Sequence, residues 1–145
     1  MKIYDFAKFY VHEKKWSVIP LKSISKEPAI LWKEFQSRFP TVDELKAWFD
    51  SGNNYNIGIV TGKVSGLTVV DLDSSVAVAF ANSHGMFSTT PTVKTTKGYH
   101  LYFQYHDSFT NKVNLSGLQI DVRGDGGFVV APPSIHPLGG IYAWE

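Results

Sequence analysis

Residues 67–73, which read Leu-Thr-Val-Val-Asp-Leu-Asp, constrain the fold more than any other segment of the chain. Their first four residues are apolar or β-branched, as in a buried strand. Two carboxylates follow where that strand ends. Because side chains alternate along a strand, we expect Asp71 and Asp73 on one face and Leu72 in the core. The chain must therefore build a sheet around a buried strand that carries two acids at its end.

Apolar periodicity and turn residues predict the other elements. Thr41 with Glu44 forms a capping box that opens a helix, and Ser74 or Ser75 caps a small apolar helix ending near Gly85. The predicted helices cover residues 3–14, 41–52 and 74–85. The predicted strands cover residues 16–21, 56–60, 67–72, 92–95, 99–105, 118–122, 127–131 and 141–144.

Two pairs of these strands are expected to form hairpins, one across Lys97 and Gly98 and one across residues 124–126. No repeat, low-complexity tract or linker divides the chain. We therefore expect residues 1–145 to form one domain of the α+β class, built on a mixed sheet.

Composition is that of an ordinary globular chain, with 43% hydrophobic and 19% charged residues in a length of 145. The longest apolar runs are too short to span a membrane and no secretory leader is visible, so a cytoplasmic location is expected. A net charge of +1 gives no overall attraction for nucleic acid, although a local cluster of basic side chains would still attract phosphates. The absence of cysteine excludes disulfides and cysteine zinc sites.

The acids at the end of the buried strand suit a divalent cation. Asp71 and Asp73 repel each other unless a positive charge lies between them. Carboxylate oxygens that leave room for water and substrate phosphates are typical of magnesium and manganese sites. Two solvated aspartates at a strand end would give the same sequence pattern.

Further candidates follow in the later strands. Lys97 and Gly98 offer a cation and backbone amides near His100, which suits a phosphate, although a histidine in a strand is also a common structural residue. Asp121 and Arg123 share a strand face, so they fit either a metal ligand beside a phosphate ligand or a surface ion pair. Asp125 is interpreted as a residue that stabilises its turn.

The segment Ala-Pro-Pro-Ser-Ile-His-Pro at residues 131–137 is too rigid for a helix or a central strand. It would hold Ser134 and His136 in fixed positions. Such positions are useful beside a ligand, and equally useful in a stiff turn.

The order of these motifs resembles the archaeal–eukaryotic primase superfamily, and most closely its bifunctional primase–polymerase domains from plasmids, phages and integrated elements. The shared pattern is Asp-x-Asp after an apolar strand, then Gly-x-His, then an apolar residue with Asp. Further matching phrases are Trp-Ser-Val-Ile-Pro-Leu at 16–21, Lys-Glu-Pro with Trp32 at 26–32, Asn-Ile-Gly-Ile-Val-Thr-Gly at 56–62, Pro-Thr-Val-Lys-Thr at 91–95, Gly-Gly-Phe-Val-Val-Ala-Pro-Pro-Ser at 126–134 and Tyr-Ala-Trp at 142–144.

The resemblance implies nucleotidyl transfer with Mg²⁺ or Mn²⁺ held by Asp71, Asp73 and Asp121. It implies that His100 contacts the phosphates of the incoming NTP or dNTP on a single-stranded DNA template. It also implies a core related to the RNA-recognition motif, a smaller N-terminal α/β subdomain and a replicative helicase as partner. We assign the nucleotide phosphates to Lys97, Gly98, Arg123, Ser134 and His136.

The chain departs from the family pattern in three respects. Gly98 stands where many relatives have serine, which removes one hydroxyl from the phosphate site. The cysteines of the zinc stem found in some relatives are absent. The helical accessory region and helicase of many relatives are expected to be missing after Trp144.

Two other functions remain open. Val-Val-Asp-Leu-Asp-Ser at 69–74 resembles the nucleophile strand of haloacid-dehalogenase-like phosphatases, in which Asp71 would attack phosphorus and Asp73 would act as acid and base. That fold also needs a later Gly-Asp-x-x-x-Asp pair, and Gly124-Asp125 has no second acid after it. The second alternative is a degenerate primase-like module that binds nucleic acid or nucleotide without catalysis.

Overall fold

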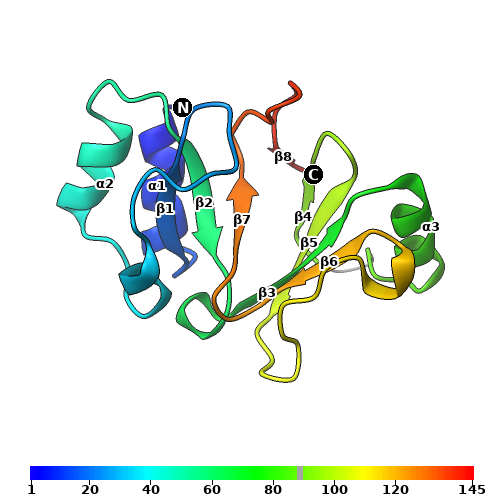
Figure 1. Ribbon diagram of the computed structural model, residues 1–145. Helices are drawn as coiled ribbons and strands as arrows, with labels where there is room; N and C mark the ends of the chain where they lie inside the picture. Colours follow the sequence, from blue (N-terminus) through cyan, green and yellow to red (C-terminus); the bar gives the residue numbers. More distant parts are fainter. Residues whose placement is uncertain (88–89) are drawn as a thin grey trace.

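The computed structural model describes residues 1–87 and 90–145, which form three α-helices and two β-sheets (Figure 1). The α-helices are α1 (Ile3–His12), α2 (Val42–Phe49) and α3 (Ser75–Ser83), and the short 3₁₀ helices are η1 (Lys33–Gln36), η2 (Lys63–Ser65) and η3 (Leu115–Gly117). The strands are β1 (Ser17–Leu21), β2 (Asn56–Val60), β3 (Leu67–Leu72), β4 (Thr92–Lys94), β5 (Tyr99–Gln104), β6 (Ile120–Arg123), β7 (Phe128–Ala131) and β8 (Ala143–Trp144).

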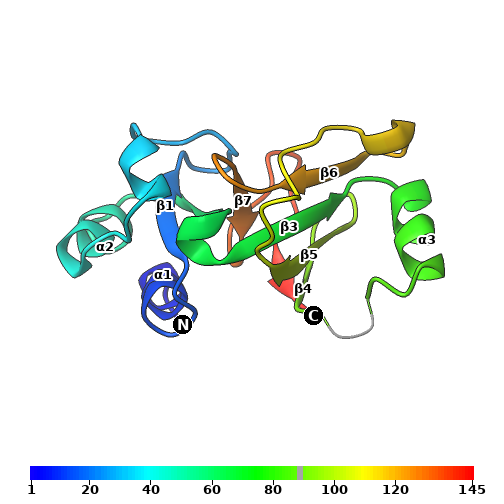
Figure 2. The same ribbon diagram turned by 90° about the horizontal axis from the view of Figure 1, so that it is seen from below.

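The smaller sheet has the strand order β1-β2-β7, and the larger has the order β6-β3-β5-β4-β8. Helices α1 and α2 lie beside the smaller sheet, and α3 lies at the opposite end of the molecule (Figures 1 and 2). The α+β class is therefore confirmed. Within the described ranges, no helix has the length and apolar character needed to cross a membrane.

The prediction of a mixed sheet is wrong, because the strand pairs of both sheets are antiparallel. A parallel pair needs a long crossover between neighbouring strands. The crossover through α3 leads from β3 to β4, but β5 lies between these two strands in the sheet. Strands that run parallel are thus separated by one that runs against both.

Local signals in the sequence predicted most elements correctly. The Thr41 capping box is present, since the Glu44 N–H donates to Thr41 Oγ1 at 3.1 Å and the Thr41 N–H donates to Glu44 Oε1 at 2.9 Å. Ser74 caps α3 by accepting the Ala77 N–H at 3.0 Å. The hairpin across Lys97 and Gly98 is confirmed by the antiparallel pairing of β4 with β5.

The second predicted hairpin, between residues 118–122 and 127–131, is wrong. β6 pairs with β3 in the larger sheet, whereas β7 pairs with β2 in the smaller one. The chain crosses between the sheets at residues 124–127, where the Thr61 side chain donates to Gly124 O at 2.6 Å and the Thr61 N–H donates to Gly127 O at 2.9 Å. These bonds extend β2 toward β7, so the two strands separate instead of folding back on each other.

β3 separates two apolar cores. Val69 belongs to the larger core, which joins both sheets to α1 and α2, and Leu72 belongs to a smaller core beneath α3. The alternation predicted for β3 is therefore confirmed. Asp71 lies on the face of Val69, toward the smaller sheet.

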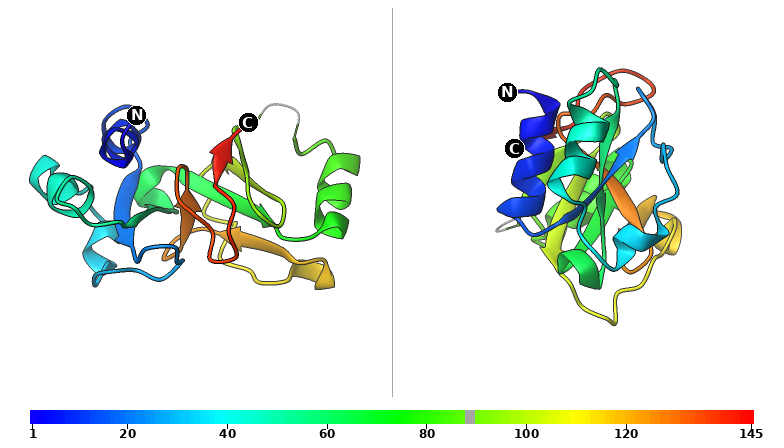
Figure 3. Two further views of the ribbon diagram at one scale, coloured as in Figure 1. Left: turned by 90° about the horizontal axis from the view of Figure 1, so that it is seen from above. Right: turned by 90° about the vertical axis from the view of Figure 1, so that its left-hand side faces the viewer.

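An aromatic cluster of Tyr10, Trp16, Tyr102 and Trp144 ties the two sheets together. Trp16 precedes β1, while Tyr102 lies in β5 and Trp144 in β8, and the Trp16–Tyr102 and Tyr102–Trp144 ring centroids are 5.3 and 5.0 Å apart. The Tyr10 hydroxyl donates to Pro132 O at 2.7 Å and accepts from Trp144 Nε1 at 2.9 Å. Figure 3 shows the C-terminal strand on the same side of the molecule as α1.

We predict that Tyr10→Phe lowers the free energy of unfolding by about 1–3 kcal/mol, because the substitution leaves the Trp144 indole N–H and Pro132 O without their partner. Chemical denaturation followed by tryptophan fluorescence measures the change. Tyr4→Phe on the same helix is the matched control, since Tyr4 is only half-buried. Equal effects of the two substitutions would contradict a specific role for the Tyr10 hydroxyl.

Candidate active site

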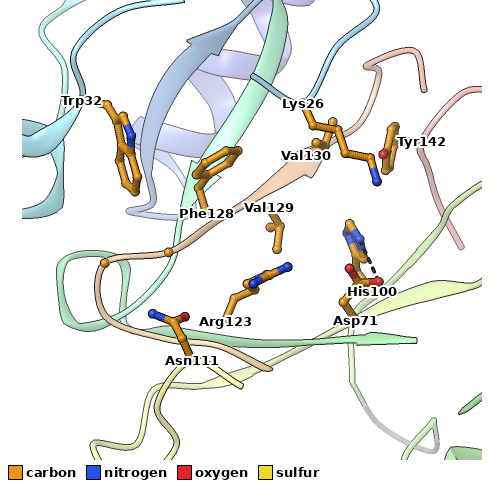
Figure 4. Close-up of a pocket in the computed structure, with 12 residues that line it drawn as sticks. Lys26, Trp32, Asp71, His100, Asn111, Arg123, Phe128, Val129, Val130 and Tyr142 are labelled. Atoms are coloured by element: carbon orange, nitrogen blue, oxygen red, sulfur yellow. Dashed lines mark ion pairs between the residues drawn. The ribbon is translucent and has the colours of Figure 1, made fainter. Parts of the chain in front are cut away.

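A cleft of about 410 Å³ opens between the two sheets (Figure 4). β3, β5 and β6 of the larger sheet form one wall, and β7 of the smaller sheet forms the other. The segment after β1 and the residue before β8 complete the rim. The lining residues are Lys26, Trp32, Asp71, His100, Asn111, Arg123, Gly126, Gly127, Phe128, Val129, Val130 and Tyr142.

Three polar side chains form a row across neighbouring strands of the larger sheet. In the strand register, Asp71 of β3 is opposite His100 of β5 on one side and opposite Asp121 of β6 on the other. Directly opposed residues in antiparallel strands project from the same face. Asp73 directly follows β3, and its N–H donates to Gln119 O, just before β6, at 3.1 Å. The fold thus brings an acid, a histidine and a second acid together from three strands.

Asp71 and His100 are the most deeply buried members of this row, with side chains 13% and 8% exposed. His100 Nε2 lies 3.5 Å from Asp71 Oδ1, as Figure 4 shows. Burial raises the pKa of the Asp71 carboxyl, but His100, Lys26 and Arg123 together outweigh burial, and the net pKa is below its ordinary value. Asp71 therefore carries its negative charge at neutral pH.

Asp73 has the opposite shift. Burial raises the pKa of its carboxyl, and the charge of Asp71 raises it further, while Lys26, Lys97 and His100 oppose these effects. A second negative charge next to Asp71 is thus unfavourable in the protein alone. A bound cation would remove this cost.

The Asp121 carboxylate already accepts hydrogen bonds from other residues of the protein. Its Oδ2 accepts from Arg123 at 3.2 Å, and its Oδ1 accepts the Asn114 N–H at 2.7 Å. Among the residues of the two described ranges, no group of three His, Cys, Asp or Glu side chains lies close enough to hold a metal ion. The geometry therefore brings Asp71 and Asp121 to one face, with Asp73 directly after β3, but without a closed set of metal ligands among the described residues, and of the three acids Asp71 lines the cleft.

The chemical type of the donor atoms nevertheless suits a magnesium or manganese ion. Asp71, Asp73 and Asp121 offer only oxygen, as these ions prefer. Within the described part of the chain, Asp71 Oδ1 is buried and makes the 3.5 Å ion-pair contact with His100 Nε2 but no hydrogen bond. Because a buried carboxylate oxygen without a hydrogen bond is costly, a cation would stabilise this atom further.

Neighbouring atoms leave no room for a side chain at Gly98. A Cβ at this position would collide with the carbonyl oxygen of Leu72, so neither alanine nor serine fits. The Gly98 N–H already donates to Thr95 Oγ1 at 3.0 Å. The serine of many relatives is therefore excluded here by close backbone approach. Lys97 is exposed and is not among the residues that line the cleft.

Ser134 and His136 also lie outside the cleft lining. The Ser134 hydroxyl is buried and accepts the Ile57 N–H of β2 at 2.8 Å, so it ties the proline-rich segment to the smaller sheet. His136 Nδ1 accepts the Leu138 N–H at 3.0 Å. Burial lowers the pKa of His136, with Lys26 and Lys97 acting in the same direction. Of the residues assigned to phosphates, Arg123 is the one that lines the cleft.

Sequence reasoning did not place Lys26 and Tyr142 in the site. The charge of Lys26 acts on both Asp71 and Asp73 from the opposite wall, although its side chain looks like any other surface lysine in the sequence. The centroid of the Tyr142 ring is 5.8 Å from that of His100 and 5.9 Å from that of His136. Lys26 and Tyr142 lie in the segments 26–32 and 142–144, which resemble the family, and this resemblance could have identified them.

Asp125 stabilises its turn, as predicted. Its Oδ1 accepts the Lys63 N–H at 2.8 Å and its Oδ2 accepts from the Tyr105 hydroxyl at 2.7 Å. These two bonds lower the pKa of the Asp125 carboxyl, the Lys63 N–H contributing most.

A cleft with a histidine–carboxylate pair, neighbouring acids and basic side chains on both walls is typical of enzymes that act on phosphate esters. The chain belongs to the family described as bifunctional DNA primase/polymerase, N-terminal, whose model matches residues 7–145. Membership in this family supports primase/polymerase function and not the phosphatase alternative. Among curated proteins, none matches the sequence.

We predict that Gly98→Ser lowers the free energy of unfolding by about 1–3 kcal/mol or more, because the new side chain must displace the Leu72 carbonyl. Gly98→Ala should cost nearly as much, since the collision involves Cβ, which both residues share. Thermal or chemical denaturation of both variants measures this, with Lys97→Ala as the neighbouring control. A stable Gly98→Ser protein would show that the turn adapts and that the hydroxyl of the relatives can be accommodated.

Proposed function

We propose that the cleft catalyses metal-dependent nucleotidyl transfer, extending and starting DNA or RNA primers on a single-stranded DNA template. The observation that carries this proposal is the row of Asp121, Asp71 and His100 across three adjacent strands, in which Asp71 and His100 line the cleft. Family membership supports the reaction class, and the strand register supports this cleft as the place where it would occur.

Asp71, Asp73 and Asp121 are the residues that would hold Mg²⁺ or Mn²⁺. When bound, the ions supply activation of the primer 3′-hydroxyl and neutralise charge developing on the α-phosphate and the leaving pyrophosphate. Two observations support this assignment: Asp71 Oδ1 accepts no hydrogen bond among the described residues, and a second charge on Asp73 is unfavourable.

The basic groups have a separate task, which is to hold the triphosphate. Arg123 lines the cleft beside the acids, and Lys26 faces them from the other wall. His100 would donate a hydrogen bond to a β- or γ-phosphate and so position the nucleotide for in-line attack. Lys97 would add positive charge from the rim, since its charge already acts on Asp73.

The larger sheet fits a core of the RNA-recognition-motif type. Its strands follow one another along the chain as β3, α3, β4, β5 and β6, and their order across the sheet is β6-β3-β5-β4. This arrangement matches a split βαβ unit in which the crossover strand is not adjacent to the first strand. The smaller sheet with α1 and α2 would be the N-terminal subdomain, and both together one catalytic domain over residues 1–145. We propose a plasmid, phage or integrated element as the replication context, with a replicative helicase as partner.

Asp71→Asn should abolish incorporation of labelled nucleotide on a primed single-stranded template with either Mg²⁺ or Mn²⁺, because the amide cannot ligate a cation as a carboxylate does. The same assay without a primer tests whether the chain starts synthesis. Asp107→Asn is the matched control, since its side chain is 86% exposed. Full activity of Asp71→Asn, in a protein whose circular dichroism and melting temperature show that it is folded, would remove the carboxylate from the mechanism.

His100→Ala should raise the apparent KM for nucleotide about ten- to hundredfold, equivalent to roughly 1.5–3 kcal/mol for a lost charge-assisted hydrogen bond. The affinity for single-stranded template should change little, because the template would run along a different surface. Separate titrations of nucleotide and template measure the two effects. Weakened template binding with an unchanged nucleotide KM would show that His100 contacts the template and not the nucleotide phosphates.

A second candidate function is nucleotide or nucleic-acid binding without catalysis. The observation in its favour is that Arg123 and the Asn114 N–H engage the Asp121 carboxylate, which leaves fewer free metal ligands. The incorporation assay separates the two functions. Nucleotide binding by wild type without any extension, in either metal, would select the binding module.

A further inference from the structure

The cleft has two chemically different parts. Asp71, His100 and Arg123 supply polar and charged groups from the larger sheet, while Trp32 and Phe128 supply aromatic surface (Figure 4). Trp32 lies on the side of the cleft away from the Asp71–His100 pair. A nucleotide has the same division, with a charged triphosphate joined through the sugar to a flat aromatic base.

The two aromatic rings are arranged so that their flat faces are not stacked on each other. Their centroids are 5.2 Å apart and their planes form an angle of 79°. In such an edge-to-face pair, at least one ring keeps both faces uncovered by its partner. A stacked pair would instead cover one face of each ring.

Both side chains are held in place before any ligand arrives. Phe128 begins β7 and is paired with Val60 of β2. The Trp32 carbonyl accepts the N–H of the buried Phe35 at 3.0 Å, and both aromatic rings pack against the larger core. A rigid aromatic surface binds a flat ligand with little loss of side-chain entropy.

We propose that Trp32 and Phe128 form the nucleobase subsite of the cleft, with Trp32 stacking on the base of the incoming nucleotide. This inference rests on the proposed function, because it assigns the triphosphate to the charged part of the same cleft. It adds a role for two residues to which no metal or phosphate contact is assigned.

The subsite binds the four bases alike. Every base offers a flat face, so stacking on aromatic side chains tolerates any sequence. Asn111, a polar side chain of the same lining, is engaged by the protein: its Nδ2 donates to Asp125 O at 2.7 Å and its Oδ1 accepts the Gly124 N–H at 2.8 Å. Recognition by flat surfaces leaves base selection to the template strand, as template-directed synthesis requires.

The test compares Trp32→Leu with Trp32→Phe in the primer-extension assay, using each deoxynucleotide in turn. Leucine keeps an apolar side chain and removes the aromatic face, so the nucleotide KM should rise roughly five- to hundredfold for all four bases. Phenylalanine keeps the face and should stay within about threefold of wild type. The matched control is Trp48→Leu, because Trp48 is a half-buried tryptophan that packs against Phe35 and Phe49 and does not line the cleft.

Inhibition by tripolyphosphate, which has no base, separates the two parts of the cleft. Its inhibition constant should be the same for wild type and Trp32→Leu. If Trp32→Leu weakens the binding of tripolyphosphate and of nucleotide equally, Trp32 only maintains the shape of the cleft, and the inference is overturned. It is also overturned if Trp32→Leu changes the affinity for template and leaves the nucleotide KM as it was.

A direct binding measurement keeps this test independent of catalysis. Nucleotide should quench the tryptophan fluorescence of wild type and of Trp48→Leu, and the quenching should be lost in Trp32→Phe. Absence of extension by wild type would overturn the proposed function alone, since quenching through Trp32 would still identify the base subsite. Extension by wild type with equal quenching in wild type and Trp32→Phe would overturn the subsite alone.

Discussion

The contact between the two sheets determines whether a site exists at all. The acids and His100 lie on the larger sheet, whereas Phe128 lies on the smaller one, so the cleft has the shape set by the aromatic cluster of Tyr10, Trp16, Tyr102 and Trp144. Apolar burial brings these rings together without fixing their angle. The Tyr10 hydroxyl adds direction, because it bonds at once to Pro132 after β7 and to Trp144 in β8. A buried polar bridge of this kind favours one orientation of the sheets over others.

Electrostatics in the cleft follow from that orientation. A carboxylate as buried as Asp71 is stable in its charged form only where positive or donor groups compensate for lost water. Here the compensation comes from both walls, from His100 and Arg123 on the larger sheet and from Lys26 opposite. Asp73, next to it, is left with an unfavourable charge. The charged groups around the two carboxylates therefore compensate the charge of Asp71 and not that of Asp73, and this imbalance is the physical argument for the proposed cation.

The sequence predicted what depends on neighbouring residues. The Thr41 capping box, the Ser74 cap, the alternation of β3 and the β4–β5 hairpin all follow from local patterns, and the structure contains each of them. Prediction from the sequence failed where strand pairing or side-chain position depends on residues far away in the chain. The segments 118–122 and 127–131 both read as strands with a glycine turn between them, and nothing local says that one pairs with β3 and the other with β2. Lys26 was missed for the same reason, since only the packing of the two sheets turns it toward Asp71.

The wrongly predicted hairpin explains how the cleft is assembled. Had β6 and β7 paired with each other, Arg123 and Phe128 would have lain on one sheet, with no opposite wall. Because the chain crosses between sheets at residues 124–127, two short neighbouring strands instead bring Arg123 to one wall and Phe128 to the other. The crossing is fixed by the hydrogen bond from Thr61 to Gly124 O and by the bonds of Asp125 to Lys63 and Tyr105. The partners Thr61, Lys63 and Tyr105 all lie outside residues 124–127. The glycines there allow the close approach, since a Cβ on Gly127 would lie 2.8 Å from Asn111 Oδ1. A turn that looks like an ordinary hairpin in the sequence is thus the link between the wall that carries Arg123 and the wall that carries Phe128.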